Sequence, residues 1–334
     1  MKKIILINFL FILIFALLAE IFSRVLNLAD LTGVNSELIT NNVDFFENSK
    51  NVKTKAFGET VYTDQYGFRV PYKNYFYKKD SSGFLILGDS TAFGVGIREE
   101  QTFVGQLRAN FMNSNFFNTS VVGYNLVDYN RVLQNKFSND FKIEHIILFL
   151  NINDIHFGNQ VFEVDNIKEL SKNNDNFPFI NWIKNNYILN NVHFFLRERS
   201  IFYMWLKGIF TKTQERFYSH VYDLYKNENN ILKLNNEIRN IKKNVEIYNS
   251  NFTIFILPYE FQTRENPCNK NYLFPQYIIK KILSKNNIKF YDYTGAFCNQ
   301  KNVSNFFLKY DPVHLSKNGH DFVFKLLKKD LFFY

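Results

Sequence analysis

Five short segments of the chain are candidate strands, at residues 84–87, 116–122, 146–150, 252–257 and 288–291. The first is apolar with no polar alternation, and the third is the clearest of the five. Such runs are typical of strands that are buried on both faces of a sheet. Segments with helical spacing of apolar residues lie between them, so strands and helices alternate along the chain. This alternation predicts a parallel sheet with helices on both faces, and right-handed crossovers would make the sheet doubly wound.

Helices are expected between and after these strands. The third and fourth expected strands are separated by residues 157–245, which contain no comparable apolar run and predict a helical insertion. We expect helices at 101–111, 128–136, 179–210, 227–244, 276–284 and 317–332. The fold class predicted in this way is α/β, with helices and a central sheet in layers.

The N-terminus predicts a membrane helix. Lys2 and Lys3 precede an apolar run at 4–26 that only a few polar residues interrupt. About 20 mostly apolar residues can cross a bilayer. A cleavable signal peptide is the alternative, but the small-residue cleavage pattern is weak here. We therefore predict an uncleaved anchor at 1–26 in the inner (cytoplasmic) membrane, with its basic end in the cytoplasm and the remaining chain in the periplasm or an equivalent compartment.

The chain after this anchor divides into two parts. Residues 27–80 show little helical periodicity and predict a juxtamembrane segment. Within it, Asp64–Arg69 should turn at Gly67 and then run extended. The remaining residues, 81–334, carry the five expected strands and predict one α/β domain that includes the helical insertion.

Composition narrows the possible partners. Apolar residues make up 46% of the 334-residue chain, which excludes a disordered protein. The net charge is +9, but the lysines are scattered and no nucleic-acid motif is present, so we expect no nucleic-acid partner. Cys268 and Cys298 could form a disulfide in an oxidising compartment, and two buried free thiols are the alternative. The sequence has no Cys/His cluster, and we predict neither a metal nor a cofactor.

A serine follows the first expected strand, in Gly88-Asp89-Ser90-Thr91. A serine hydroxyl is a poor nucleophile until a base removes its proton. The helix that begins here would favour negative charge developing at its N-terminus. On this evidence alone, Ser90 could equally be a helix cap.

The missing parts of a catalytic triad lie near the C-terminus, in Asp311-Pro312-Val313-His314. A triad needs an imidazole base and a carboxylate that fixes its tautomer. A three-residue separation can bring both side chains to one side of a turn. Taken alone, His314 could be a surface or capping histidine. Together with the serine that follows a buried strand, Asp311 and His314 predict a Ser-His-Asp triad.

Acyl transfer also requires donors for the oxyanion of the tetrahedral intermediate. The backbone N–H groups of Ser90 and Gly123 and the side-chain amide of Asn153 would supply them. Gly123 could be a simple turn glycine, and asparagine is abundant in this chain. Both residues nevertheless follow an expected strand, and sites in parallel sheets form at the carboxyl ends of strands.

These motifs resemble, in order, those of the SGNH hydrolases, a branch of the GDSL family. The resemblance covers roughly 81–160 and 250–334, and Asn151 stands where that family usually has glycine. It implies a three-layer α/β/α fold like flavodoxin with a central parallel five-stranded sheet. It also implies that Ser90 is the nucleophile, His314 the base and Asp311 its orienting acid, and that Ser90, Gly123 and Asn153 form the oxyanion hole. The matching motifs are Gly88-Asp89-Ser90, Gly123, Asn153-Asp154 and Asp311-x-x-His314.

The resemblance and the predicted compartment together suggest a function. We expect a serine esterase that removes O-acyl groups, with O-acetyl preferred, from an extracytoplasmic polysaccharide. An O-acyltransferase is the first alternative, in which a membrane acyltransferase partner delivers the acyl group to a sugar hydroxyl. A lipid esterase and a non-catalytic glycan-binding or scaffold protein are the others. The expected partners are therefore an ester-bearing glycan and, through the first helix, the membrane.

Overall fold

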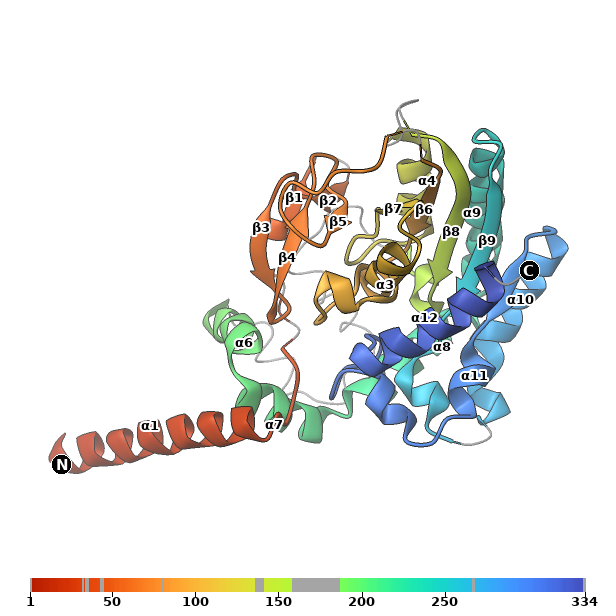
Figure 1. Cartoon of the computed structure of the whole chain (residues 1–334). Helices are drawn as coiled ribbons and strands as arrows, with labels where there is room; N and C mark the ends of the chain where they lie inside the picture. Colours follow the sequence, from red (N-terminus) through yellow and green to blue (C-terminus); the bar gives the residue numbers. More distant parts are fainter. Residues whose placement is uncertain are drawn as a thin grey trace.

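The structure is a computed structural model, and Figure 1 shows the whole chain. It describes residues 2–31, 33, 36–42, 45–79, 81–135, 141–157, 187–265 and 268–332.

The centre of the fold is a parallel sheet. Its five parallel strands are β6 (Gly83–Leu87), β7 (Asn115–Asn118), β8 (Ile143–Leu150), β9 (Asn251–Ile256) and β10 (Phe290–Asp292). They are arranged in the order β10-β9-β8-β6-β7, and each neighbouring pair is parallel. Counted along the chain this order is 2-1-3-4-5, which is the flavodoxin-like doubly wound arrangement. The predicted fold class is confirmed.

The strands are apolar because both faces of the sheet are covered. All residues of β6 are buried. Leu85 and Leu87 point into one hydrophobic cluster, whereas Phe84 and Ile86 point into the other. Alternate residues of one strand therefore serve two cores, which explains why the sequence shows no polar alternation here.

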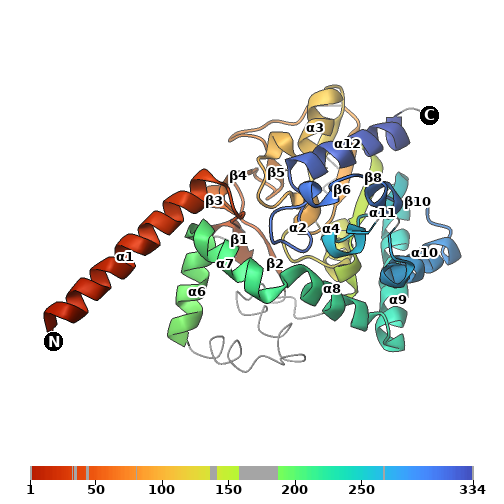
Figure 2. The same cartoon turned by 90° about the horizontal axis from the view of Figure 1, so that it is seen from below.

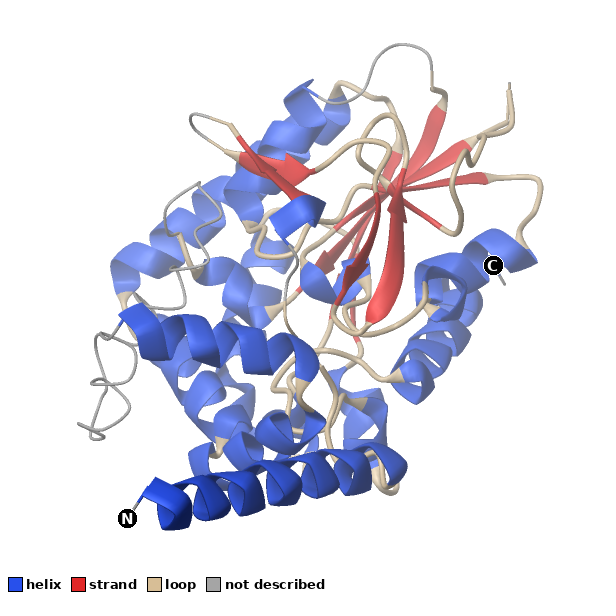
Figure 3. Cartoon of the chain, turned by 90° about the vertical axis from the view of Figure 1, so that its left-hand side faces the viewer, coloured by secondary structure: helices blue, strands red, loops and turns tan. Residues whose placement is uncertain are grey.

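Helices cover each face of the sheet, and Figure 3 shows the strands between them. On one side, α3 (Phe103–Asn110), α11 (Thr294–Cys298) and α12 (Lys317–Phe332) contribute residues to the cluster around Phe84. On the other side, α4 (Leu126–Asn135), α9 (Glu228–Glu246) and α10 (Phe274–Lys285) contribute to the cluster around Leu85. This is the three-layer α/β/α arrangement that the sequence predicted.

The segment before the first parallel strand also belongs to the sheet. It contains β3 (Lys53–Ala56), β4 (Glu59–Thr63) and β5 (Arg69–Val70), and β5 pairs antiparallel with β7. The sheet therefore has eight strands and is mixed, whereas the sequence predicted only its five parallel ones. A separate two-stranded sheet joins β1 (Ile39–Asn41) to β2 (Phe46–Asn48). The segment 27–80 is thus folded against the α/β domain.

The insertion is helical where it is described, and residues 158–186 lie outside the described part. The helix expected at 179–210 is two helices, α6 (Tyr187–Arg199) and α7 (Ile201–Thr211). Ser200 separates them, because its hydroxyl caps α7 by accepting the backbone N–H of Tyr203. α8 (Thr213–Leu224) follows and leads to α9. The remaining short helices are η1 (Ser36–Leu38), α2 (Ser90–Phe93), η2 (Glu99–Gln101), η3 (Ile152–Ile155), η4 (Glu260–Thr263), η5 (Lys270–Leu273) and η6 (Val303–Phe306).

The first helix, α1 (Lys2–Val25), extends away from the domain (Figures 1 and 2). Its segment Lys3–Val25 is long and apolar enough to cross a membrane, and the apolar window within it is not buried by the rest of the chain. A signal sequence near an N-terminus would have the same properties.

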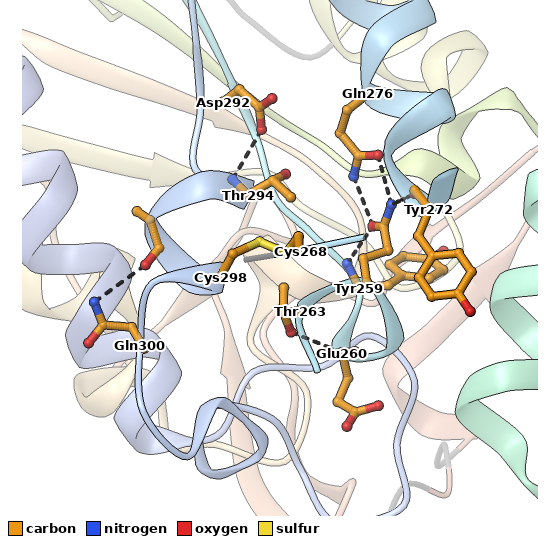
Figure 4. The surroundings of a disulfide bond; sticks show 12 residues. Tyr259, Glu260, Thr263, Cys268, Tyr272, Gln276, Asp292, Thr294, Cys298 and Gln300 are labelled. Carbon is orange, nitrogen blue, oxygen red and sulfur yellow. Dashed lines mark hydrogen bonds between the residues drawn. A yellow bond between two sulfur atoms is a disulfide. The ribbon is translucent and has the colours of Figure 1, made fainter. Parts of the chain in front are cut away.

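Cys268 and Cys298 are joined by a disulfide, with their Cα atoms 5.4 Å apart. Figure 4 shows that the bond connects α11 to the segment that follows η4. Both half-cystines are buried. The disulfide therefore ties together two connections that leave the carboxyl ends of β9 and β10.

Candidate active site

The nucleophile candidate lies where β6 ends and α2 begins. Asp89 is the N-cap of α2, and its Oδ1 accepts the backbone N–H of Thr91 at 2.9 Å. Ser90 is therefore the first residue of the helix and is 8% exposed. Gly88 is required before it, because a Cβ there would lie 2.5 Å from the Cβ of Ala92.

Asp311 and His314 form a hydrogen-bonded pair. His314 Nδ1 donates to Asp311 Oδ2 at 2.8 Å. The other carboxylate oxygen, Oδ1, accepts the backbone N–H groups of Val313 at 2.9 Å and His314 at 2.8 Å. Asp311 thus holds the turn and the imidazole together, and it leaves Nε2 of His314 as the ring nitrogen that can act as a base.

The pair shifts the pKa of both partners. Burial acts to lower the pKa of His314, but the Asp311 carboxylate outweighs it and raises that pKa above its usual value of 6.5. Burial acts to raise the pKa of Asp311, but His314 and the two backbone donors hold it below its usual range. Asp311 is therefore ionised at neutral pH, as the orienting acid of a triad has to be.

Two observations indicate that Asp311 and His314 lie at the same edge of the sheet as Ser90. Gly96, just past α2, packs so closely on Leu308 that a Cβ at Gly96 would lie 2.7 Å from the side chain of Leu308. The Asp89 carboxylate, next to Ser90, also contributes to raising the pKa of His314. The structure therefore places the first and last predicted motifs beside one another.

Asn153 is also at this edge, in η3 at the end of β8. Its Nδ2 donates to Asp89 Oδ2 at 3.2 Å. A side-chain amide carries two donor hydrogens, so one remains for an oxyanion. Gly123 lies in the exposed turn after β7 at a φ of +89°, a conformation that favours glycine. The same turn is tied to the nucleophile turn, because Val121 N donates to Gly88 O at 3.3 Å.

Asn151 has a role that the sequence analysis missed. Its Nδ2 donates to Asp89 Oδ1 at 2.8 Å and to Thr91 Oγ1 at 2.9 Å. Its φ of −104° is one that any residue adopts, so glycine is not needed here. The Asn151 side chain therefore braces the turn that carries Ser90.

Asp154 supports this arrangement from inside the core. Its carboxylate accepts the Tyr129 hydroxyl at 2.8 Å and the backbone N–H of Asn151 at 2.9 Å. Burial raises its pKa well above the usual value. Asp154 therefore fixes the turn that carries Asn151 and Asn153, and it is itself too deeply buried to meet a substrate.

Arg69 is a second residue that the sequence analysis did not assign. It lies on β5 and is fully buried, and its guanidinium donates to the backbone carbonyls of Phe93, Gly94 and Ile97. Burial lowers its pKa to about 9, so it is charged at neutral pH. It therefore holds the C-terminal end of the helix that begins at Ser90, where a cation is favourable to the helix dipole.

The environment of the pair also includes Arg197, on α6 of the insertion. Its charge is near enough to lower the pKa of His314, and Asp311 in turn affects the pKa of Arg197. The insertion therefore reaches the candidate site.

Other sites are less well supported. Within the described residues, no group of three or more His, Cys, Asp or Glu side chains could hold a metal ion. A hollow of about 860 Å³ is lined by residues that include Ile143 and Asn251, the first residues of β8 and β9. It therefore lies at the amino ends of the strands, at the edge of the sheet opposite to Ser90.

No family model matches the sequence, and no curated protein matches it. Several solved structures are similar in fold. A member of the lipolytic protein G-D-S-L family from Veillonella parvula is 14% identical, with 75% of this chain and 98% of that chain covered and a TM-score of 0.39. The acetylxylan esterase Axe2 from Geobacillus stearothermophilus is 16% identical, with 77% and 98% covered and a TM-score of 0.43. An acetyl xylan esterase, AlAXEase, is 13% identical, with 75% and 99% covered and a TM-score of 0.44.

Because these identities and TM-scores are low, we argue the function from the residues of this chain alone. The site combines a serine at a helix N-terminus, an imidazole held by a carboxylate and a nearby amide donor. A nucleophilic serine needs groups of these kinds, namely an oriented imidazole base and donors for an oxyanion.

Proposed function

We propose that the chain is a serine esterase in which Ser90, His314 and Asp311 form the catalytic triad. The observation that carries this proposal is the Asp311–His314 hydrogen bond of 2.8 Å beside the turn that presents Ser90. A carboxylate that also accepts two backbone N–H groups is fixed in place, and it fixes the imidazole in turn. The His314 side chain is 18% exposed, and this hydrogen bond leaves its Nε2 as the ring nitrogen that can accept a proton.

The reaction follows from these positions. Ser90 Oγ attacks the ester carbonyl carbon, and its proton passes to His314 Nε2. The oxyanion is stabilised by the N–H groups of Ser90 and Gly123 and by the free amide hydrogen of Asn153. When the intermediate collapses, the alcohol leaves with the proton from His314. Water then attacks the acyl-enzyme, His314 removes its proton, and the acid is released with Ser90 restored.

We propose an O-acyl group, with acetyl preferred, on an extracytoplasmic glycan as the substrate, and α1 as a single membrane anchor. The length and apolar character of Lys3–Val25 support the anchor. The Cys268–Cys298 disulfide supports the compartment, because disulfides persist outside the reducing cytoplasm.

The test uses the full chain in detergent, as wild type and as Ser90→Ala. Acetate release from p-nitrophenyl acetate and labelling by a fluorophosphonate probe are measured on the same preparations. We expect turnover and labelling in the wild type and neither in Ser90→Ala, with equal far-ultraviolet circular dichroism. A folded wild-type protein that neither turns over the ester nor reacts with the probe would refute the esterase proposal.

A further inference from the structure

The helix α7 is apolar around almost its whole circumference. Its sequence, Ile-Phe-Tyr-Met-Trp-Leu-Lys-Gly-Ile-Phe-Thr, contains Lys207 as its charged residue. A helix of this kind needs apolar surroundings on all sides, in a protein core or in a membrane. The question is therefore what surrounds each of its faces.

One face packs on the α/β domain. Met204 and Gly208, one turn apart, are the buried residues of α7. Gly208 touches the ring of Tyr310, because a Cβ at Gly208 would lie 2.3 Å from that ring. Protein therefore covers this face, and the contact places α7 directly beside the loop that carries Asp311.

The other face is apolar and exposed. Leu206 is 39% exposed, Ile209 45% and Phe210 77%. These positions, at i, i+3 and i+4, form one stripe. An exposed stripe of apolar side chains is typical of an interaction surface.

The place of this surface in the fold indicates its partner. Glu20, near the end of α1, accepts hydrogen bonds from Ser200 Oγ at 2.7 Å and from the backbone N–H groups of Ile201 and Phe202, both at 3.1 Å. It therefore caps the N-terminus of α7. The guanidinium of Arg24 donates to Arg199 O. The two helices are thus joined where the apolar segment of α1 ends.

The direction of α7 agrees with a position on the membrane surface. Figure 1 shows α7 beside the end of α1, and Figure 2 shows it running across the line of α1. If α1 crosses the bilayer, a helix that runs across it at this end lies along the bilayer surface. α7 also carries Tyr203 and Trp205, the residue types that are enriched at this depth.

We propose that α7 rests in the outer surface of the lipid bilayer, with Leu206, Ile209 and Phe210 among the phospholipid acyl chains. The proposal rests on the proposed anchoring by α1 and goes beyond it, because it fixes how the domain sits on the membrane. Interfacial helices bind through such an apolar face. A protein partner on the same face would be the competing arrangement.

The test is depth-dependent quenching of tryptophan fluorescence in the full chain. The two natural tryptophans, Trp182 and Trp205, are replaced by phenylalanine, and one reporter is introduced at a time: Phe210→Trp, Ile247→Trp or Phe11→Trp. Ile247 is the matched control, because it is 78% exposed and lies at the end of α9, at the opposite edge of the sheet. Phe11 lies within α1 and reports the anchoring itself. Each variant is reconstituted in vesicles of phosphatidylethanolamine and phosphatidylglycerol that contain phosphatidylcholine brominated at a known acyl carbon.

We expect Phe210→Trp to lose emission most with bromines near the glycerol end of the acyl chains, and Phe11→Trp to lose emission in the same vesicles. Ile247→Trp should be unchanged. Unquenched Phe210→Trp beside quenched Phe11→Trp would overturn the proposal while leaving the anchor intact. Equal quenching at Phe210 and Ile247 would overturn it too, since the contact would not be specific to α7. Unquenched Phe11→Trp would overturn the anchoring and this proposal together, whereas the esterase activity is measured separately.

Discussion

Replacing Arg69 by methionine should destabilise the protein and displace Ser90. Arg69 is fully buried and donates to the backbone carbonyls of Phe93 and Gly94, at the end of α2, and of Ile97, in the segment that follows. It also stacks on the Phe93 ring, with its guanidinium carbon 4.6 Å from the ring centre. Methionine keeps much of the apolar stem but provides no donor.

The magnitude follows from two opposing effects. Gly94 O keeps a donor without Arg69, because it also accepts the backbone N–H of Ile97. A buried carbonyl left without a donor costs about 1–3 kcal/mol, so the carbonyls of Phe93 and Ile97 together would cost roughly 2–6 kcal/mol. Removing a buried charge recovers part of this cost, since burying an ion is expensive by about several kcal/mol. We therefore expect a net loss of about 1–4 kcal/mol of unfolding free energy. For a chain of this size the thermal midpoint should fall by roughly 2–12 °C.

The assay has a stability reading and an activity reading. Thermal unfolding in detergent is followed by circular dichroism, and p-nitrophenyl acetate turnover is measured at a temperature where Arg69→Met remains folded. Because α2 begins at Ser90, a shift of this helix misplaces the nucleophile, and kcat should fall by about 10²-fold while KM changes little. Arg98→Met is the control, because that side chain is 62% exposed and its ion pair with Glu59 is a surface one.

Two results would refute this reasoning. An Arg69→Met protein with a thermal midpoint equal to that of Arg98→Met would show that the three carbonyl contacts contribute little. An Arg69→Lys protein with wild-type stability and kcat would show that a point charge is sufficient. A lysine cannot reproduce the planar set of donors, so we expect it to be impaired as well.

Three further predictions concern the pair, the contact of α7 with the domain and the disulfide. Ester turnover by the wild type should rise with pH through the pKa of His314, which lies above 6.5, because the neutral imidazole is the base. In Asp311→Asn, the midpoint of the pH–rate curve should move to lower pH, and kcat should drop by about 10⁴-fold. A midpoint that does not move would contradict the pairing. Gly208→Leu should push α7 away from Tyr310, lower the unfolding free energy by about 1–3 kcal/mol in thermal unfolding and reduce kcat. Unchanged stability and kcat would show that α7 and Tyr310 are not tightly packed. Cys298→Ser opens a loop of sequence separation 30 and should cost about 3–4 kcal/mol in thermal unfolding, whereas no loss would mean that the disulfide is not formed in the native protein.

The parallel sheet could be predicted because its signal is local. Phe84–Leu87 is apolar throughout, and a strand buried on both faces leaves this pattern in any context. The strand expected at 116–122 ends earlier, as β7 at Asn118, because the following residues form the turn that leads to Gly123. The turn at Gly67 and the extended segment after it are present as predicted, the latter as β5, but the antiparallel pairing of β3, β4 and β5 was missed for the opposite reason. β5 is only Arg69–Val70, and its pairing with β7 depends on contacts that no local pattern encodes.

The same distinction applies to the candidate site. Ser90, Asp311 and His314 stand in short motifs beside predicted elements, so the sequence alone predicts that they lie close together. Asn151 and Arg69 could not be assigned, because each acts through partners that are distant in sequence. Asn151 reaches Asp89 across 62 residues, and Arg69 reaches Phe93 across 24. For Arg69, the signal in the sequence is its position shortly after the turn at Gly67, and this position does not identify the hydrogen-bond partners of the guanidinium group.

The loop that carries Asp311 connects the proposed triad to the proposed membrane anchor. Lys309, two residues before Asp311, donates its backbone N–H to Asp30 Oδ2 at 2.7 Å and its ammonium group to Asn27 O, just after α1 ends. Burial raises the pKa of Asp30, and the charge of Asp311 adds to this effect. Tyr310, which lies between Lys309 and Asp311 in this loop, packs on Gly208 of α7. An esterase built in this way would hold its triad close to the bilayer, so the esters within its reach are those presented near the membrane surface.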